Sequence, residues 1–162
     1  MDLHTFTLIH TAISLLALLA GIPVVAALSH SRIAAPWTSV FLVLAILTSL
    51  TGFLFPIHGL TPALTTGIVA CLVFAVVLMA RYSLRLDGAG RWLYAVGMVI
   101  SLYLLVFVTI AQAFNKIGFL HNLAPTGAEA PFAIVQLVVL IGFVVLALRV
   151  ARRFRPRLAI AV

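Results

Sequence analysis

Five apolar runs of about 20 residues divide the sequence, and none contains Asp, Glu, Lys or Arg away from its ends. A helix rises 1.5 Å per residue, so about 20 residues cross the roughly 30 Å hydrocarbon core of a bilayer. Charged residues make up only 8% of the chain, whereas soluble domains carry about 25%. The sequence therefore predicts an all-α integral membrane protein. The expected spans are residues 6–28, 36–55, 62–81, 92–114 and 131–150.

Short segments rich in turn residues separate these runs, such as Pro56 to Pro62 and Asp87 to Gly90. No linker and no repeat of 20 to 50 residues divides the chain. We therefore expect residues 1–162 to form a single transmembrane domain, a five-transmembrane-helix bundle, in which residues 151–162 are a basic tail.

The basic residues predict the orientation of this bundle. The chain has ten Lys and Arg against three Asp and Glu, and cytoplasmic loops carry an excess of Lys and Arg. If the C-terminus is cytoplasmic, nine of the ten basic residues lie inside and only Lys116 lies outside. We therefore expect the N-terminus outside and the C-terminus in the cytoplasm.

Half of the basic residues follow the last apolar run, where anionic lipid headgroups lie at the inner face of the bilayer. This position favours a topology anchor that contacts anionic lipids over a nucleic-acid site, and we expect no nucleic-acid partner. The residues concerned are Arg149, Arg152, Arg153, Arg155 and Arg157.

Polar side chains gather in the outer halves of the expected spans, while the inner halves are almost purely apolar. In the first span they recur at spacings of three and four, which places them on one arc about 120° wide. We expect an outward-facing polar pocket, because an unpaired polar group in hydrocarbon costs several kcal/mol. The alternative is that these groups bond one another or their own helix backbones. The candidate lining is His10, Thr11, Ser14, Thr48, Thr66, Gln112, Lys116 and Gln136.

Four of the five histidines fall on the expected outer side. Imidazole is a common ligand of zinc, copper and haem iron, so His10, His58 and His121 are the candidate metal ligands. Neither the i, i+4 spacing of a helix-borne site nor a nearby set of carboxylates accompanies them. Interfacial histidines without a ligand are the competing interpretation.

Other chemistry finds little support. Cys71 is the single cysteine, so the chain cannot form an intramolecular disulfide. There is no Gly-rich phosphate loop, no Ser/His/Asp set and no carboxylate inside a span. These features favour a protein that is not an enzyme and needs no cofactor.

Three motifs carry a resemblance to a known family. They are Thr51 to Pro56 (TGFLFP), Gln112 to Ile117 (QAFNKI) and Leu123 to Thr126 (LAPT), with Glu129, Pro131, Phe132 and Gln136 beyond. From the second span to the tail, the chain resembles a family of small uncharacterised bacterial polytopic inner-membrane proteins with no assigned activity. The resemblance implies a bacterial, inner-membrane location only.

Together these patterns favour a small-molecule binding or permeation unit, or an accessory subunit, with its site near the outer surface. A redox protein that carries haem or quinone in the same region is the alternative. A bundle of 17.4 kDa leaves little room for a wide channel, so transport would call for a homo-oligomer or a larger membrane complex.

Overall fold

The computed structural model describes residues 2–56, 59 and 61–155, and within these residues the chain is helical and contains no strand. The elements are α1 (Leu3–Ser29), α2 (Ala35–Gly52), α3 (Pro62–Leu78), the π-helix η1 (Met79–Ser83), α4 (Ala89–Lys116), α5 (Gly118–Leu123) and α6 (Ala130–Arg153). Five helical stretches of this described part are long and apolar enough to cross a membrane, with η1 continuing α3. The prediction of five such helices is confirmed.

Local sequence explains where several helices begin. The side chains of Asp2 and Thr61 accept hydrogen bonds from the amides of Thr5 and Leu64, and so cap the first turns of α1 and α3. Proline lies in the first turn of α2, α3 and α6, where its missing N–H costs nothing. α2 ends at Gly52, three residues before the expected end of the second span.

The chain makes an unexpected turn at the end of α3. η1 inserts a π-helical stretch, and Arg85 and Leu86 then adopt left-handed backbone angles with φ of 49° and 59°. The Leu86 amide donates to the carbonyl of Ala80 (3.1 Å), a bond that resembles the helix-terminating Schellman pattern. Hydrophobic periodicity does not reveal such a local insertion.

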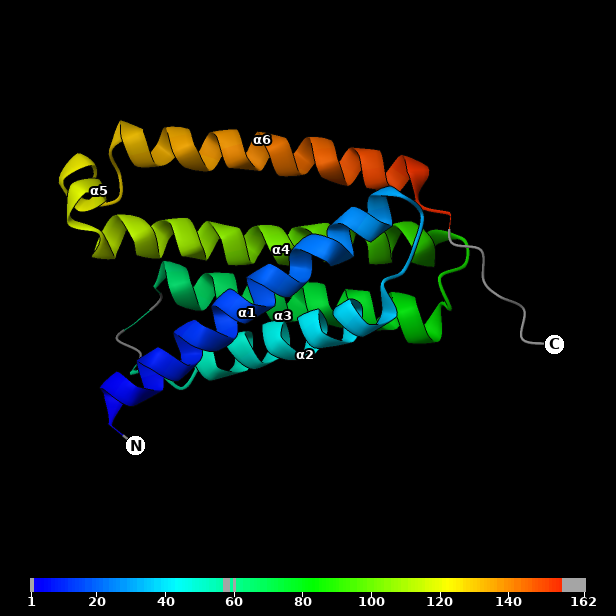
Figure 1. Ribbon diagram of the computed structural model, residues 1–162, viewed down its shortest axis with the longest axis horizontal. Helices are drawn as coiled ribbons and strands as arrows, with labels where there is room; N and C mark the ends of the chain where they lie inside the picture. The colour runs from blue at the N-terminus through cyan, green and yellow to red at the C-terminus, as the bar shows by residue number, and fades with distance from the viewer. Residues whose placement is uncertain (1, 57–58, 60, 156–162) are drawn as a thin grey trace.

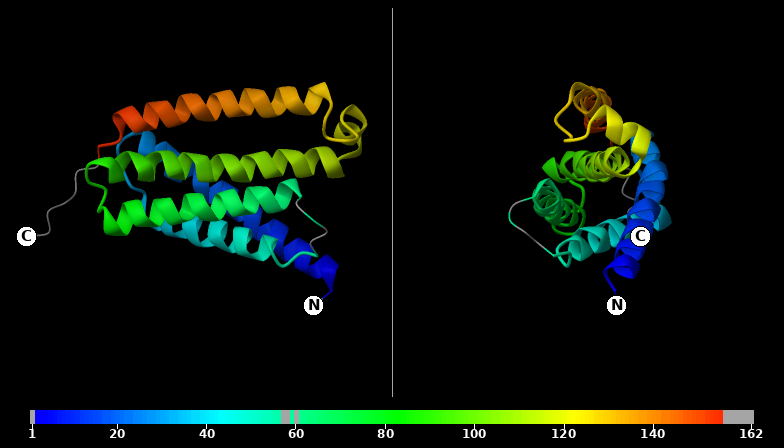
Figure 2. Two further views of the ribbon diagram at one scale, coloured as in Figure 1. Left: turned by 180° about the vertical axis from the view of Figure 1, so that it is seen from behind. Right: turned by 90° about the vertical axis from the view of Figure 1, so that its left-hand side faces the viewer.

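The helices lie side by side, and α1 crosses the others diagonally (Figures 1 and 2). α1 begins beside the end of α2 and ends beside the end of α6, while α5 joins α4 to α6 (Figure 1). We call the end where α1 begins the N-terminal end, and the end where α1 and α6 finish the arginine end.

The core forms where α1 crosses α2 and α4. A Cβ atom added to Gly21 would lie 2.6 Å from Leu102 Cδ1 and 2.8 Å from Phe41 Cε2. Gly97 of α4 meets Val77 of α3 in the same way, at 2.5 Å from Cγ2. Both glycines therefore allow neighbouring helices to approach closely.

Candidate functional site

The predicted pocket residues lie toward the N-terminal end, but they do not all converge. Several hydroxyl groups bond their own helix, as Ser14 does to the carbonyl of His10 (2.7 Å) and Thr66 to that of Pro62 (2.7 Å). Thr11, Gln112 and Lys116 are exposed. The alternative of intrahelical bonding therefore describes Ser14 and Thr66.

His10 is the candidate that joins two helices. Its Nδ1 lies 2.8 Å from Thr51 Oγ1 of α2, and its half-buried ring meets that of Phe55 edge-on at 5.1 Å between centroids. The Phe6 ring also packs against Phe55, with ring centroids 4.8 Å apart. The imidazole is therefore held between α1 and α2 by one hydrogen bond and by aromatic contacts.

The tautomer of His10 sets the direction of its hydrogen bond with Thr51. The Thr51 hydroxyl has one hydrogen, and the acceptors within reach are His10 Nδ1 (2.8 Å) and the carbonyls of Leu47 (2.7 Å) and Thr48 (3.2 Å). When that hydrogen goes to a carbonyl, Thr51 accepts the bond from the Nδ1–H of His10. In this tautomer, Nε2 of the neutral ring has a lone pair that can accept a hydrogen bond or bind a metal.

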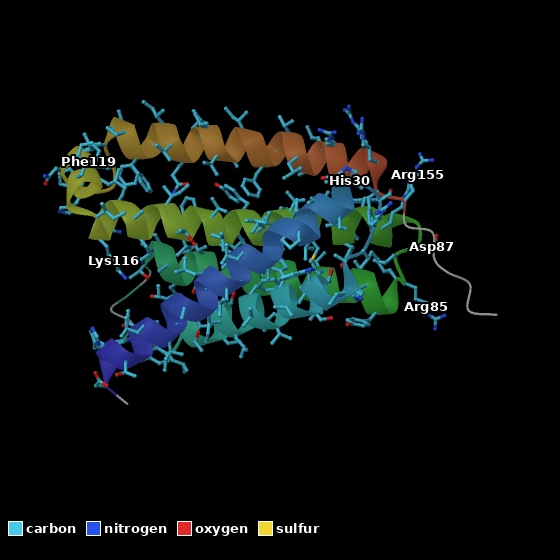
Figure 3. The ribbon with its side chains drawn as sticks, viewed as in Figure 1. His30, Arg85, Asp87, Lys116, Phe119 and Arg155 are labelled. Atoms are coloured by element: carbon cyan, nitrogen blue, oxygen red, sulfur yellow. The ribbon has the colours of Figure 1, made fainter. Side chains whose placement is uncertain are left out.

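Lys116 brings a positive charge to the same end of the molecule. It is the last residue of α4, and Figure 3 places it at the N-terminal end, opposite Arg85 and Arg155. His10 of α1, Thr51 of α2 and Lys116 of α4 thus lie at the same end of the molecule, together with Phe55, which follows α2.

Gln136 and Thr48 contribute buried polar atoms outside this group. Gln136 is 8% exposed, and its Nε2 donates to the Phe107 carbonyl of α4 (3.1 Å). Its Oε1 and the Thr48 hydroxyl oxygen are buried without a hydrogen-bond partner in the described part of the chain. Gln136 therefore joins α6 to α4, rather than α6 to His10.

The histidine candidates do not assemble into a metal cluster in the part that the structure describes. His121 is exposed on α5, and His58 lies outside the described residues. Within residues 2–56, 59 and 61–155, no group of three or more His, Cys, Asp and Glu could hold a metal ion. Within this part of the chain, a metal bound at His10 would have His10 as its imidazole ligand and no cluster of further ligands beside it.

The arginine end contains a buried polar pair that the sequence analysis did not predict. Tyr94 of α4 is fully buried, and its hydroxyl oxygen accepts a hydrogen bond from Nη1 of Arg81 in η1 (3.1 Å). The Arg81 guanidinium also lies over the rings of Tyr82 and Tyr94, 5.8 Å from each centroid. An arginine in the last turn of one span and a tyrosine in the first turns of the next were the available signal.

Comparison of the chain with family models, curated proteins and solved structures finds no match. The family resemblance described above therefore remains a prediction.

Proposed function

We propose that this chain is a polytopic protein of the bacterial inner membrane, with its N-terminal end outside and its arginine end in the cytoplasm. The five apolar helices of the described residues support insertion. Arginines of the α1–α2 turn, η1 and the end of α6 lie at one end, whereas Lys116 lies at the other (Figure 3). This distribution agrees with the excess of Lys and Arg in cytoplasmic loops.

Its function, in this proposal, is non-enzymatic binding of a small molecule at the N-terminal end, centred on His10. The observation that carries the proposal is the bond between His10 Nδ1 and Thr51 Oγ1. A second group that holds one ring nitrogen fixes the ring and directs the other nitrogen to a ligand. A ligand with a hydrogen-bond donor suits Nε2, and an apolar portion suits the Phe6 and Phe55 rings.

Packing in the middle of the bundle favours binding over permeation through a single copy. Ala17, Ala20 and Gly21 of α1 are buried, and Gly21 lies close to Phe41 and Leu102. This apolar layer lies between His10 and the arginine end. An ion or polar solute would have to cross it without a hydrogen-bonding partner, at a cost of several kcal/mol.

Native mass spectrometry of the detergent-purified protein tests the binding proposal. We expect a bound small molecule on the unmodified protein and its loss from the His10→Ala variant. His4→Ala, which changes an exposed histidine of the same helix, should keep it. Retention of the same bound mass by His10→Ala at unchanged occupancy would contradict the proposal.

A second pair of variants tests the role of Thr51. Thr51→Val removes the acceptor for His10 Nδ1–H and should lower the occupancy of the bound molecule. Thr65→Val is the matched control, because the Thr65 hydroxyl is exposed and bonds only the carbonyl of Thr61 (3.1 Å). Equal occupancy in the two variants would show that the orientation of His10 is irrelevant.

The free Nε2 also supports the alternative proposal, a redox protein in which His10 is an axial ligand of haem or a contact to quinone. An imidazole with one nitrogen bonded to the protein is a usual haem ligand. Protein expressed with sufficient haem should then show a Soret band that His10→Ala lacks. A missing Soret band in the unmodified protein would remove the haem version.

A further inference from the structure

The arginine end holds an open cavity of about 630 Å³ that the proposed function does not use. It lies between the turn that joins α1 to α2 and the end of α6, and Figure 3 shows His30 beside that end of α6. Its lining is Ser29, His30, Ser31, Arg32 and Arg153.

Ser31 fixes the two walls of this cavity to each other. Its hydroxyl donates to the carbonyl of Arg153 (2.7 Å) and accepts the backbone N–H of Arg155 (2.7 Å). The first of these bonds joins residues 122 positions apart in the chain. Ser31 itself has a left-handed backbone angle, φ 58°, which is uncommon outside glycine. The backbone beside Arg32 is therefore held against the backbone of Arg153.

Neighbouring contacts anchor both walls. Phe154 follows Arg153, is fully buried, and packs against Tyr94 with ring centroids 6.0 Å apart. His30 Nδ1 lies 2.9 Å from the carbonyl of Ala26, so Nδ1–H donates there and Nε2 is left for a ligand. The exposed guanidinium groups of Arg32 and Arg153 thus project from anchored backbone.

The charge of this cavity is uncompensated by acidic side chains. The sequence has three carboxylates, all of them in the described residues, and none lines the cavity. Asp2 and Glu129 precede α1 and α6 at the opposite end, and Asp87 Oδ1 accepts the Gly88 amide (2.7 Å). The carbonyl ends of α1 and α6 carry about half a negative charge each, less than the two arginines of the lining provide.

We propose that this cavity binds a phosphate group, with Arg32 and Arg153 as its two guanidinium contacts. Arginine pairs with phosphate through two parallel hydrogen bonds, and the free Nε2 of His30 and the Ser29 hydroxyl lie at the same cavity. The phosphate could belong to an anionic phospholipid headgroup or to free inorganic phosphate. The site is independent of His10 and differs from general attraction of the tail to the membrane, because it requires one particular pair of arginines.

Native mass spectrometry of the protein in nanodiscs of phosphatidylcholine with a minor fraction of phosphatidylglycerol tests the lipid source. We expect one phosphatidylglycerol per chain, with an affinity at least about tenfold lower in the double variant Arg32→Gln/Arg153→Gln, because two charge-assisted contacts are lost. The double variant Arg149→Gln/Arg152→Gln removes the same charge from the same end, outside the lining. It should change the affinity by less than about twofold.

Inorganic phosphate, added to protein in pure phosphatidylcholine nanodiscs, tests the other source. A rise in Tm over chloride at equal ionic strength, absent in Arg32→Gln/Arg153→Gln, would identify free phosphate as a ligand. Phosphatidylglycerol binding without this rise would assign the site to the lipid. Ser31→Ala keeps every arginine and should weaken whichever ligand binds severalfold, which separates loss of the site from loss of charge.

Two results would overturn the proposal. The first is an equal loss of phosphatidylglycerol in both double variants, because it would show general electrostatic attraction. The second is the absence of both phosphatidylglycerol and phosphate binding in the unmodified protein. A change of His10 should leave this binding intact, so failure of the proposed function and failure of this site are distinguishable.

Discussion

Two side-chain hydroxyl groups, those of Thr51 and Tyr94, form hydrogen bonds between helices. Apolar surroundings raise the cost of losing such a bond, because a polar group without a partner is unfavourable there. Thr51 receives the imidazole of His10 between α2 and α1, and Tyr94 receives the guanidinium of Arg81 between α4 and η1. Removing one member of such a pair leaves the other without a partner, which costs more than the bond itself contributes. These residues are therefore the ones at which conservative substitutions should have measurable effects.

Tyr94→Phe should destabilise the bundle by roughly 1–3 kcal/mol, because Arg81 would lose a hydrogen bond in a half-buried position. Thermal or denaturant unfolding in detergent measures the change. Tyr82→Phe is the matched control, since Tyr82 is 68% exposed and should tolerate the loss of its hydroxyl. Equal stability of the two variants would show that the Arg81–Tyr94 bond contributes nothing.

At the level of helices, close approach depends on particular small residues. α3 and α4 meet at Gly97 and Val77, and α1 meets α2 and α4 at Gly21. Valine is stiff at χ1 in a helix, so Val77 cannot easily move aside for a new methyl group. α6 differs, because Gly142 has no atom within 4 Å of the position that a Cβ would take.

Gly97→Ala should therefore destabilise the protein by roughly 1–3 kcal/mol through overpacking against Val77. Gly142→Ala should be neutral or stabilising by up to about 1 kcal/mol, because alanine is the better helix former. Unfolding of the two variants under the same conditions compares them. A Gly97→Ala protein as stable as Gly142→Ala would contradict the tight α3–α4 contact.

The loop before α6 depends on pH through Glu129. Desolvation is the largest single influence and raises the pKa of this carboxyl, but the hydrogen bonds from the Thr126 hydroxyl and amide and from the Ala128 amide together outweigh it, so the net pKa lies below the ordinary 4.5. A lowered pKa in the folded state means that the contribution to loop stability is present above pH 4.5 and is lost as pH falls through the folded value.

We expect the amide protons of Thr126 and Ala128 to shift together in NMR spectra, with a midpoint below pH 4.5. Glu129→Gln should abolish this titration, since the amide side chain has no proton to gain. A midpoint at or above 4.5 in the unmodified protein would mean that these bonds do not favour the carboxylate.

At the level of the whole molecule, the orientation makes a direct prediction. Reporter fusions in the α2–α3 connection, at Gly59, should report the outer side, and fusions at Gly88, before α4, should report the cytoplasm. Gly59 precedes α3 and Gly88 follows η1, so the two glycines lie at opposite ends of the helical stretch that α3 and η1 form. The reverse pattern would place His10 on the cytoplasmic side and the arginine-end cavity outside.

Hydropathy predicts the five long helices because each apolar run carries its own signal. The contacts between helices carry no such signal, so the pairing of His10 with Thr51 and the exposure of Gln112 could not be foreseen. The arc of polar side chains on the first span illustrates this point. Its members share a helix, yet His10 bonds Thr51 of α2 while Thr11 is exposed. The Arg81–Tyr94 pair depends on η1, whose insertion leaves no trace in the periodicity.

The order of contacts along the chain has a consequence for biogenesis. The most extensive packing joins helices that follow one another, namely α1 with α2, α3 with α4, and α4 with α6. A helix that leaves the ribosome therefore meets its main partner soon after it enters the bilayer, so assembly can proceed during synthesis. The bonds of Ser31 to Arg153 and Arg155 span more than 120 residues, and they can form only after α6 has been synthesised. Ser31 would then bond the α1–α2 turn to the end of α6 after the five helices have entered the bilayer.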